Sequence, residues 1–248
     1  MVSVLHIWNT AGVASVIAKY QMKLLGWRTW VITRKQNDPC GLTTYGEAIT
    51  LPKELFLLKA LFLARKYDII HVHSLDKIIP LVKKLYPHKP IVLHYHGSDI
   101  RRKWSDKKKL WRQANAVLVS TRDLLENAPE DVVYLPNPID TEIFRPIPGL
   151  KQPGHALFIT SHEPKHKSSL NWAYKVAQRM NLKLYILNKD KNHVPHVKMP
   201  FFLNRFEYFI DHNWVPALSK TALEALACGL KVIRWDEKIV VGLPEEHK

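Results

Sequence analysis

The sequence predicts an α/β protein made of two Rossmann-like domains, in which parallel strands alternate with helices. Apolar runs of strand length alternate with segments of helical periodicity through both halves of the chain. At the N-terminus, the strand Val2–Trp8, the helix Val13–Leu25 and the strand Trp27–Thr33 follow one another in the order of a βαβ unit. Towards the C-terminus, a polar turn, a short helix and a buried strand lie between Leu218 and Ile233. A Rossmann-like sheet is therefore expected in each half.

The first half contains enough apolar runs for a complete sheet. Residues 34–52 interrupt the alternation, because Pro and Gly punctuate them, and they are expected to be irregular. The further strands expected in this half are Asp68–His73, Pro90–His94, Ala116–Ser120 and Val132–Leu135, and the further helices are Lys53–Lys66, Ile78–Tyr86, Arg101–Gln113 and Thr121–Asn127.

The second half restarts the same pattern after a connector stiffened by prolines. We predict an N-terminal domain over residues 1–146, a linker over 147–153 and a short C-terminal domain over 154–248. The elements expected in the C-terminal domain are strands at Ala156–Thr160, Lys183–Leu187 and Leu230–Ile233, and helices at Leu170–Met180, at Asn204–Ile210 and from Ser219.

The composition is that of a globular protein with an anionic partner. The 248 residues are 46% hydrophobic, and 37 Lys and Arg against 22 Asp and Glu give a formal charge of +15. A nucleotide, an acidic lipid and a nucleic acid all fit this charge. No apolar run approaches about 18 residues and the N-terminus lacks the pattern of a signal peptide, so we expect no membrane span and no export. A buried thiol at Cys228, unpaired with the distant Cys40, favours the cytoplasm.

Histidines gather where two neighbouring strands end. His73 ends one strand, and His94 and His96 lie at the end of the next. Ligands of open α/β sheets bind beyond the carboxyl ends of the strands, so these side chains are expected near one crevice. Three histidines also suit zinc, but no carboxylate or thiolate stands at ligand spacing with them, and we expect no metal. Gly12 opens the first helix, where it either lets a ligand approach the backbone or simply forms a tight turn.

The helix that begins at Ser219 has the features of a phosphate site. Ser219, Lys220 and Thr221 occupy the N-cap and first turn, where backbone N–H groups lack partners within the helix. These groups and the Lys220 side chain form a candidate anion site. Glu224 lies one turn further along, where a carboxylate is suited to binding hydroxyl groups.

The stretch Arg101–Gln113 is strongly basic and carries Trp104 and Trp111 seven residues apart. Two buried tryptophans beneath a solvated basic face are one interpretation. A surface that contacts anionic lipid is another, because aromatic and basic residues together suit a membrane interface. Single-stranded nucleic acid is a third.

Several motifs, taken in order, resemble one family. The stretch NPIDTEIFRP over residues 137–146 is similar to the interdomain segment of the retaining glycosyltransferases of GT-B fold, which include bacterial glycogen synthase and the phosphatidylinositol mannosyltransferases. DIIHVHS, HYHGSDIR and LEALACGLKVI resemble further motifs of this family, and the turn at Gly12 resembles its first Gly-rich loop. The chain is therefore identified as a member of glycosyltransferase group 1, or family 4, over nearly its whole length.

The resemblance implies a GT-B fold, with two Rossmann-like domains facing each other across a cleft. It implies transfer of a sugar from a nucleotide-diphosphate donor to a glycan or lipid-linked acceptor, with retention and with no metal or other cofactor. His96 and Lys167 take catalytic roles by this resemblance. Donor binding falls to Gly12, His162, Ser219, Lys220, Thr221 and Glu224, where His162 replaces a family arginine. A cytoplasmic protein that is peripheral on the inner face of the membrane would suit a lipid-linked acceptor.

Two other function classes remain open from the sequence. Pro216 stands where the family has a second glutamate, eight positions before Glu224, and this favours a degenerate protein that binds nucleotide or glycan without turnover. The positive charge alone supports a nucleic-acid-binding protein, although the motifs lead us to expect no nucleic acid.

Overall fold

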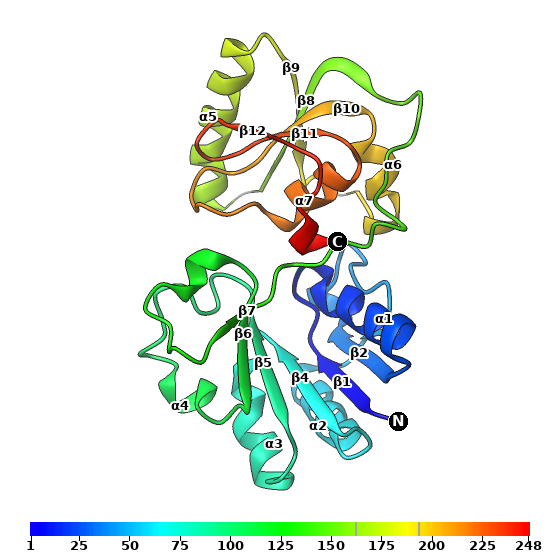
Figure 1. Ribbon diagram of the computed structural model, residues 1–248, viewed down its shortest axis with the longest axis vertical. Helices are drawn as coiled ribbons and strands as arrows, with labels where there is room; N and C mark the ends of the chain where they lie inside the picture. Colours follow the sequence, from blue (N-terminus) through cyan, green and yellow to red (C-terminus); the bar gives the residue numbers. More distant parts are fainter. Residues whose placement is uncertain (162, 193) are drawn as a thin grey trace. The chain divides into compact units, whose positions relative to one another are not determined.

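The computed structural model describes residues 1–161, 163–192 and 194–248, with the side chains of residues 164–167 outside the description. The chain forms two compact units, Met1–Pro138 (unit 1) and Ile139–Lys248 (unit 2), drawn in Figure 1. Each unit is built on its own sheet, so the prediction of two Rossmann-like domains in an α/β protein is confirmed.

Unit 1 contains a seven-stranded sheet in the order β3-β2-β1-β4-β5-β6-β7, and every neighbouring pair is parallel. This order starts at the centre and runs outwards in both directions, as in a Rossmann sheet. The strands are β1 Ser3–Ile7, β2 Arg28–Arg34, β3 Glu47–Ile49, β4 Ile69–His73, β5 Ile91–Tyr95, β6 Ala116–Val119 and β7 Val133–Tyr134.

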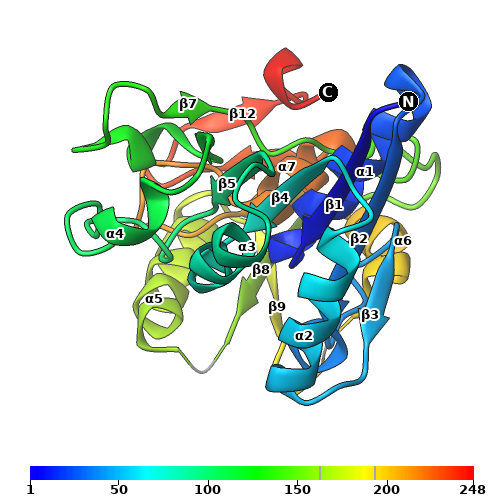
Figure 2. The same ribbon diagram turned by 90° about the horizontal axis from the view of Figure 1, so that it is seen from below.

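The two faces of this sheet carry different side chains. Helices α2 (Lys53–Ala64) and α3 (Ile79–Leu85) pack on an apolar face, whose core includes Leu5 and Ile70. Helix α1 (Val13–Leu25) lies on the opposite side, as Figure 2 shows, and packs its alanines against Val31. Side chains alternate along a strand, so the residues between the apolar ones point towards this second face. Among them are several histidines.

Unit 2 contains a five-stranded sheet in the order β12-β11-β10-β8-β9. Strands β8 to β11 pair in parallel, and β12 joins β11 in the antiparallel direction. Its elements are β8 Gln152–Thr160, α5 Pro164–Arg179, β9 Lys183–Asn188, α6 Met199–Leu203, β10 Phe206–Ile210, α7 Lys220–Ala227, β11 Lys231–Ile233 and β12 Ile239–Val241.

The ends of two predicted helices are set by the residues that the sequence indicated. Helix α1 spans Val13–Leu25, and glycines in the left-handed region, Gly12 (φ 76°) and Gly26 (φ 65°), flank it. Helix α7 begins after Ser219, whose hydroxyl accepts a hydrogen bond from the Ala222 N–H at 3.1 Å. Both predictions are confirmed.

The prediction of a helix at Asn204–Ile210 is wrong. Phe206–Ile210 is the strand β10, which lies between β8 and β11 in the middle of the sheet of unit 2. Phe, Tyr and Ile favour a pleated strand, and burial on both faces of a parallel sheet hides the alternation that would have revealed it.

The prediction of a basic helix over Arg101–Gln113 is also wrong. Only Lys108–Trp111 is helical within this stretch, as α4, because Arg102 adopts φ 60° and stops any helix from running through it. Trp104 is buried, and its indole N–H donates to the Leu124 carbonyl at 3.0 Å. The stretch is therefore a folded connection, and its first tryptophan belongs to the core of unit 1.

The boundary between the units lies after Pro138, earlier than the predicted end of the first domain at residue 146. Ile139 and Phe144, which follow that boundary, are buried in the core of unit 2. The region 34–52 also contains more structure than expected, since β3 pairs with β2 at the sheet edge.

Gly46 is the most crowded glycine of unit 1, and substituting it tests the packing of this region. It adopts φ 115°, and a Cβ there would lie 2.3 Å from the Val31 carbonyl oxygen. We expect Gly46→Ala to lower the free energy of unfolding by roughly 3 kcal/mol, from strain and overpacking combined. Gly26→Ala is the matched control, because a Cβ there meets nothing within 4 Å and should cost only about 1 kcal/mol. Equal losses in urea titrations would contradict the predicted clash.

Candidate functional site

The carboxyl ends of β1, β4, β5 and β6 form the candidate site of unit 1. The backbone there is unusually strained, since Trp8 (φ 76°), Ala11 (φ 51°) and Ser74 (φ 59°) all adopt positive φ without being glycine. Gly12 lies beside them, and a Cβ on it would lie 3.3 Å from the Leu42 carbonyl oxygen. A side chain is therefore disfavoured at Gly12 by both its φ and its surroundings.

The Asp99 carboxylate holds the loop that follows β5 in place. It accepts hydrogen bonds from the backbone N–H groups of His96 at 2.9 Å and of Gly97 at 2.7 Å, and from the Ser74 hydroxyl at 2.6 Å. The Ser74 hydroxyl also lies 2.9 Å from that of Thr10. These contacts connect the ends of β1, β4 and β5.

His96 uses both of its ring nitrogens within the protein. Nε2 lies 3.0 Å from Nδ1 of His73, and Nδ1 lies 2.6 Å from the Ser120 hydroxyl. Both partners are buried. A ligand that bonded to a ring nitrogen of His96 would therefore have to displace one of them, although the residue is partly exposed at this edge.

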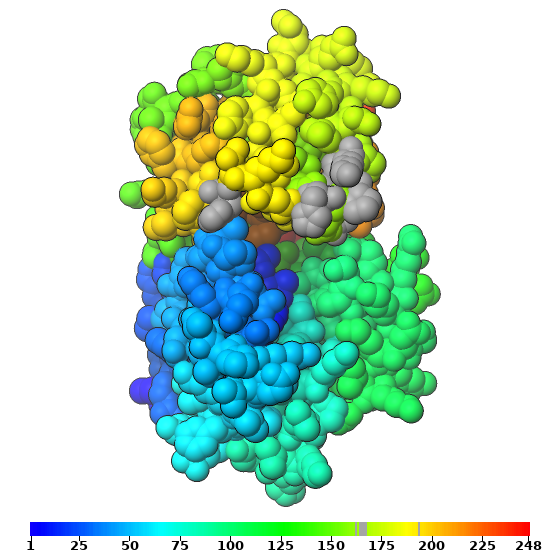
Figure 3. All heavy atoms as spheres, turned by 180° about the vertical axis from the view of Figure 1, so that it is seen from behind, coloured from blue at the N-terminus to red at the C-terminus, as the bar shows by residue number. Residues whose placement is uncertain are grey.

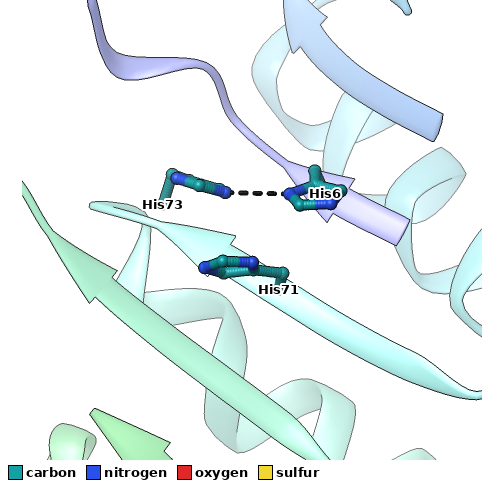
Figure 4. Close-up of side chains that lie close together, drawn as sticks. All are labelled: His6, His71 and His73. Carbon is teal, nitrogen blue, oxygen red and sulfur yellow. Dashed lines mark hydrogen bonds between the residues drawn. The ribbon is translucent and has the colours of Figure 1, made fainter. Parts of the chain in front are cut away.

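His96 belongs to a group of five closely packed rings, which we call the histidine cluster. His71 and His73 stack with ring centroids 4.2 Å apart, and His6 Nδ1 faces His73 Nε2 at 3.1 Å, as Figure 4 shows. Further contacts between ring centroids lie between 4.2 and 5.6 Å. The members of the histidine cluster are His6, His71, His73, His94 and His96.

Burial keeps the histidine cluster neutral. Loss of hydration lowers the pKa of His6 to about 4, partly offset by its hydrogen bond to Gln21. The same cause lowers the pKa of His96 to about 4, although the negative charge of Asp99 opposes it. Burial first, and repulsion from neighbouring rings second, also hold the pKa values of His71, His73 and His94 well below the usual range. None of the five is therefore charged at neutral pH.

Two sets of three histidines place their nitrogens within 4.8 Å of one another, and metal binding must be considered for both. The sets are His6, His71 and His73, and His73, His94 and His96. A metal ion lies in the plane of each imidazole that binds it, so three ligand rings must point at one position. Here His6 and His73 point at each other while His71 stacks beside them (Figure 4). In the second set, Nδ1 of His73 and Nε2 of His96 face each other in the same way, 3.0 Å apart. Both sets are thus hydrogen-bonded stacks, which differ from the converging rings of a coordination shell.

In unit 2 the start of α7 presents backbone donors. Ser219 caps the helix, and its own N–H donates to the Asp211 carboxylate at 2.9 Å. Among the described residues, the N–H groups of Lys220 and Thr221 donate to no protein acceptor. They are two of the donors that a helix leaves unpaired in its first turn.

Glu224 is buried one turn into the same helix. One of its carboxylate oxygens, Oε1, lies 3.3 Å from the Lys220 ammonium and 3.2 Å from Nε2 of His196. Burial by itself would raise the pKa of Glu224, but the Lys220 charge and the His196 hydrogen bond outweigh it, so the pKa lies below its usual value. The carboxylate is thus ionised and held by two partners.

The remaining predicted site residues are located less fully. His162 lies outside the described residues, and Lys167 falls within α5 but its side chain is not among those described. The structure therefore leaves the predictions for these two residues untested. It brings together Ser219, Lys220, Thr221 and Glu224 in unit 2, and Gly12 and His96 at one edge of the sheet in unit 1.

Three contact residues were missed from the sequence. His6 is the next-to-last residue of β1, Ser120 directly follows β6, and His196 precedes α6. The alternation of His6 with Leu5 and Ile7 was the available signal for His6, because it places that side chain on the opposite face from the apolar core. His196 has no signal in its surroundings, since only the tertiary fold brings it to Glu224.

Apolar side chains are also exposed on α2. Leu55, Leu58 and Phe62 are 50%, 62% and 52% exposed, and the Arg65 guanidinium lies 4.2 Å from the centre of the Phe62 ring. The light-blue stretch that contains α2 forms part of the outer surface of unit 1 in Figure 3. Within the described ranges of the chain, no helix has the length and apolar character needed to cross a bilayer.

The buried histidines predict a pH dependence of stability. Since their folded pKa values lie below about 6.5, the value in an unfolded chain, the unfolded state binds more protons between pH 6.5 and pH 4. Stability should be fully present above that range and fall as the pH drops through it, by up to about 1.4 kcal/mol per pH unit for each neutral histidine. Urea titrations across this range measure the slope.

His71→Phe keeps an aromatic ring in the stack but removes one titrating group. It should therefore reduce the slope of the unfolding free energy against pH by the contribution of one histidine. His88→Asn is the control, because His88 is exposed and lies outside the histidine cluster. A slope in His71→Phe equal to that of the unmodified protein would contradict the assignment.

The fold is shared with solved structures at low sequence identity. Sucrose-phosphate synthase from Thermosynechococcus elongatus is similar with a TM-score of 0.57 and 14% identity, over 94% of this chain and 81% of that chain. MnaA from S. aureus, in a co-structure with UDP, gives a TM-score of 0.53 and 14% identity over 97% and 80%. UDP-GlcNAc 2-epimerase from Methanocaldococcus jannaschii gives 0.50 and 11% over 94% and 83%. These likenesses establish the GT-B fold, and since they include an epimerase, the fold alone does not select a reaction.

The family is established by sequence. A search of curated proteins returned no match. The family model described as Glycosyltransferase Family 4 matches residues 16–143, which is just over half of the 248 residues and includes most of unit 1. The motifs at His73 and His96 lie inside the matched range. The chain belongs to glycosyltransferase family 4.

Proposed function

We propose that the protein transfers a sugar from a nucleotide-diphosphate donor to a glycan or lipid-linked acceptor, with retention of configuration at the anomeric carbon. Membership of glycosyltransferase family 4 supports sugar transfer in general. The arrangement at the start of α7 supports the nucleotide-diphosphate donor, because a capped first turn, a lysine and an ionised carboxylate lie together there. This arrangement is the observation that carries the proposal.

The diphosphate binds at the first turn of α7. The N–H groups of Lys220 and Thr221 point out of the helix end, where the helix dipole favours negative charge. The Lys220 ammonium adds a full positive charge, although Glu224 shares it. An incoming diphosphate therefore competes with Glu224 for Lys220, which links donor binding to the position of that carboxylate.

Glu224 accepts hydrogen bonds from the ribose hydroxyls. Its carboxylate is ionised, so it offers acceptors only, and hydroxyl groups are the complementary donors. Nε2 of His196 holds Oε1 at 3.2 Å and limits the rotation of the side chain. The pair therefore selects a sugar hydroxyl over a phosphate at this position.

Breaking the donor bond separates charge. The bond between the anomeric carbon and the phosphate oxygen breaks, and a bond between that carbon and an acceptor hydroxyl oxygen forms, with the hydroxyl proton passing to the departing diphosphate. As the first bond breaks, positive charge develops on the sugar ring and negative charge on the diphosphate. The helix N–H groups stabilise the leaving group, together with Lys167 and His162 by the family resemblance. In unit 1, Gly12 and His96 lie at the carboxyl edge of the sheet, which is the acceptor side by the family resemblance. Both ring nitrogens of His96 already form hydrogen bonds within unit 1, so its role is to shape the site.

A panel of nucleotide sugars tests this function. We expect one nucleotide-diphosphate sugar to raise the melting temperature of the protein, since a ligand that binds only the folded state stabilises it. The same donor should then lose its sugar to a lipid extract or a glycan, detected with a radiolabelled donor. Stabilisation by no donor would overturn the proposal.

A second candidate function is binding without turnover. Pro216 supports it, because no carboxylate stands at that position in line with the family pattern. The panel separates the two candidates, since a degenerate protein would be stabilised by the donor but would neither hydrolyse nor transfer its sugar.

Removing the carboxylate of Glu224 tests the ribose assignment. We expect Glu224→Ala to weaken nucleoside-diphosphate binding in calorimetry by roughly ten-fold or more, the size expected for hydrogen bonds to a charged group. Glu237→Ala is the control, because Glu237 is exposed and pairs with Arg179 on the surface. Unchanged affinity in Glu224→Ala, with folding verified by its melting temperature, would remove Glu224 from the donor site.

We also propose that the protein binds anionic membranes peripherally, through α2 and not through Arg101–Gln113. Trp104 is buried and so is not available to a bilayer. Helix α2 instead exposes Leu58 and Phe62, with Arg65 beside them, which is the combination that binds an interface. A lipid-linked acceptor would be reached from such a position.

Sedimentation with vesicles tests this contact. We expect Leu58→Glu combined with Phe62→Glu to weaken binding to vesicles that contain anionic lipid by about ten-fold or more, because two exposed apolar side chains are lost. Val197→Glu is the matched control, since Val197 is 79% exposed in unit 2. Equal effects of the α2 pair and the control would place the contact elsewhere.

A further inference from the structure

Six side chains of unit 1 form one continuous line of hydrogen bonds, which we call the hydrogen-bond chain. It starts at the partly buried Gln21 on α1, crosses β1, β4 and β5, and ends inside the sheet. Its links measure 2.9, 3.1, 3.0, 2.6 and 3.0 Å. In order, the members are Gln21, His6, His73, His96, Ser120 and His94.

Neutral rings allow this chain only two arrangements. A neutral imidazole has one N–H and one lone pair, so a ring that donates at one nitrogen must accept at the other. The buried Ser120 hydroxyl has one hydrogen, and accepting from both histidine neighbours would leave that hydrogen without an acceptor, so it donates to one histidine and accepts from the other. The direction of one link therefore fixes the direction of all five, and the chain reverses as a unit.

The two ends of the chain select one direction. If Oε1 of Gln21 accepts a hydrogen bond from His6, every link donates in the direction from His94 towards Gln21. The last ring nitrogen, Nδ1 of His94, then carries a lone pair and no hydrogen. In the reverse direction that nitrogen would carry a hydrogen. His94 Nδ1 is buried and has no partner among the described residues. A buried N–H without an acceptor is the rarer and costlier defect, so the first direction is favoured.

We propose that the hydrogen-bond chain fixes the tautomer of His96, with hydrogen on Nε2 and a lone pair on Nδ1 that accepts from Ser120. In this arrangement Ser120 and His73 are positioning residues for His96, and Gln21 sets the direction from three links away. Every ring of the chain then carries its hydrogen on Nε2.

The proposal gives His96 a defined preference at the ligand edge. A ligand that displaced the Ser120 hydroxyl would meet a lone pair, so it would have to donate a hydrogen bond, and a hydroxyl fits where a phosphate oxygen does not. This consequence rests on the proposed function, because it takes His96 to border the ligand. The tautomer itself does not rest on it.

Nitrogen NMR of protein labelled with ¹⁵N-histidine tests the tautomer without any substrate. Two-bond correlations between the carbon-bound hydrogens of the imidazole ring and its nitrogens show which nitrogen is protonated. We expect His6, His73, His94 and His96 each to give the pattern of hydrogen on Nε2. Hydrogen on Nδ1 of His96, or rapid averaging between its tautomers, would overturn the proposal.

Variants at Gln21 supply the distinguishing test. Gln21→Lys replaces the terminal acceptor with a donor, so it should move the hydrogen of His96 from Nε2 to Nδ1. This effect would reach His96 through His6 and His73, which lie between the two residues in the hydrogen-bond chain. Gln21→Glu, studied at mildly alkaline pH, keeps an acceptor and should preserve the original pattern. A His96 pattern that is identical in both variants would overturn control by Gln21. If the protein transferred no sugar but His96 still carried its hydrogen on Nε2, the proposed function would be wrong and the proposed tautomer would be supported.

Discussion

The neutrality of the histidine cluster is the constraint on which unit 1 depends. A parallel sheet must be covered on both faces, and one face of this sheet carries five imidazole rings where a Rossmann sheet usually carries aliphatic side chains. Rings only 4.2 Å apart in the closest pairs could not all be charged without strong repulsion. Burial lowers their pKa values, and hydrogen bonds among the rings replace those that water would have made.

Much of the fold could be predicted from the sequence, because its local signals agreed with the tertiary structure. Glycine at both ends of α1 and the N-cap at Ser219 are decided within a few residues. The predictions failed where contacts distant in sequence decide the conformation. The segment β10 is a strand because it pairs with strands on both sides of it. The conformation of the Arg101–Gln113 stretch depends on the burial of Trp104.

The candidate site was predictable in part for the same reason. The start of α7 is local, so Lys220 and Glu224 could be placed on one turn by spacing alone. The hydrogen-bond partners of the candidate site residues come from elsewhere in the chain. His196 is 28 residues from Glu224, and Ser120 is 24 from His96, distances that no periodic pattern spans. The sequence therefore indicated these side chains as candidates, and only the fold showed which hydrogen-bond partners they have.

The edges of the two sheets differ in their capacity to recruit another chain. Strands β3, β7 and β12 are two or three residues long, and such short edges offer too few free backbone groups to pair with an extra strand. The other outer strand, β9, has six residues and exposes Tyr185 beside the charged Lys183. If this protein self-associates by strand addition when concentrated, β9 is the edge at which growth would start, and Lys183 is the residue that opposes it.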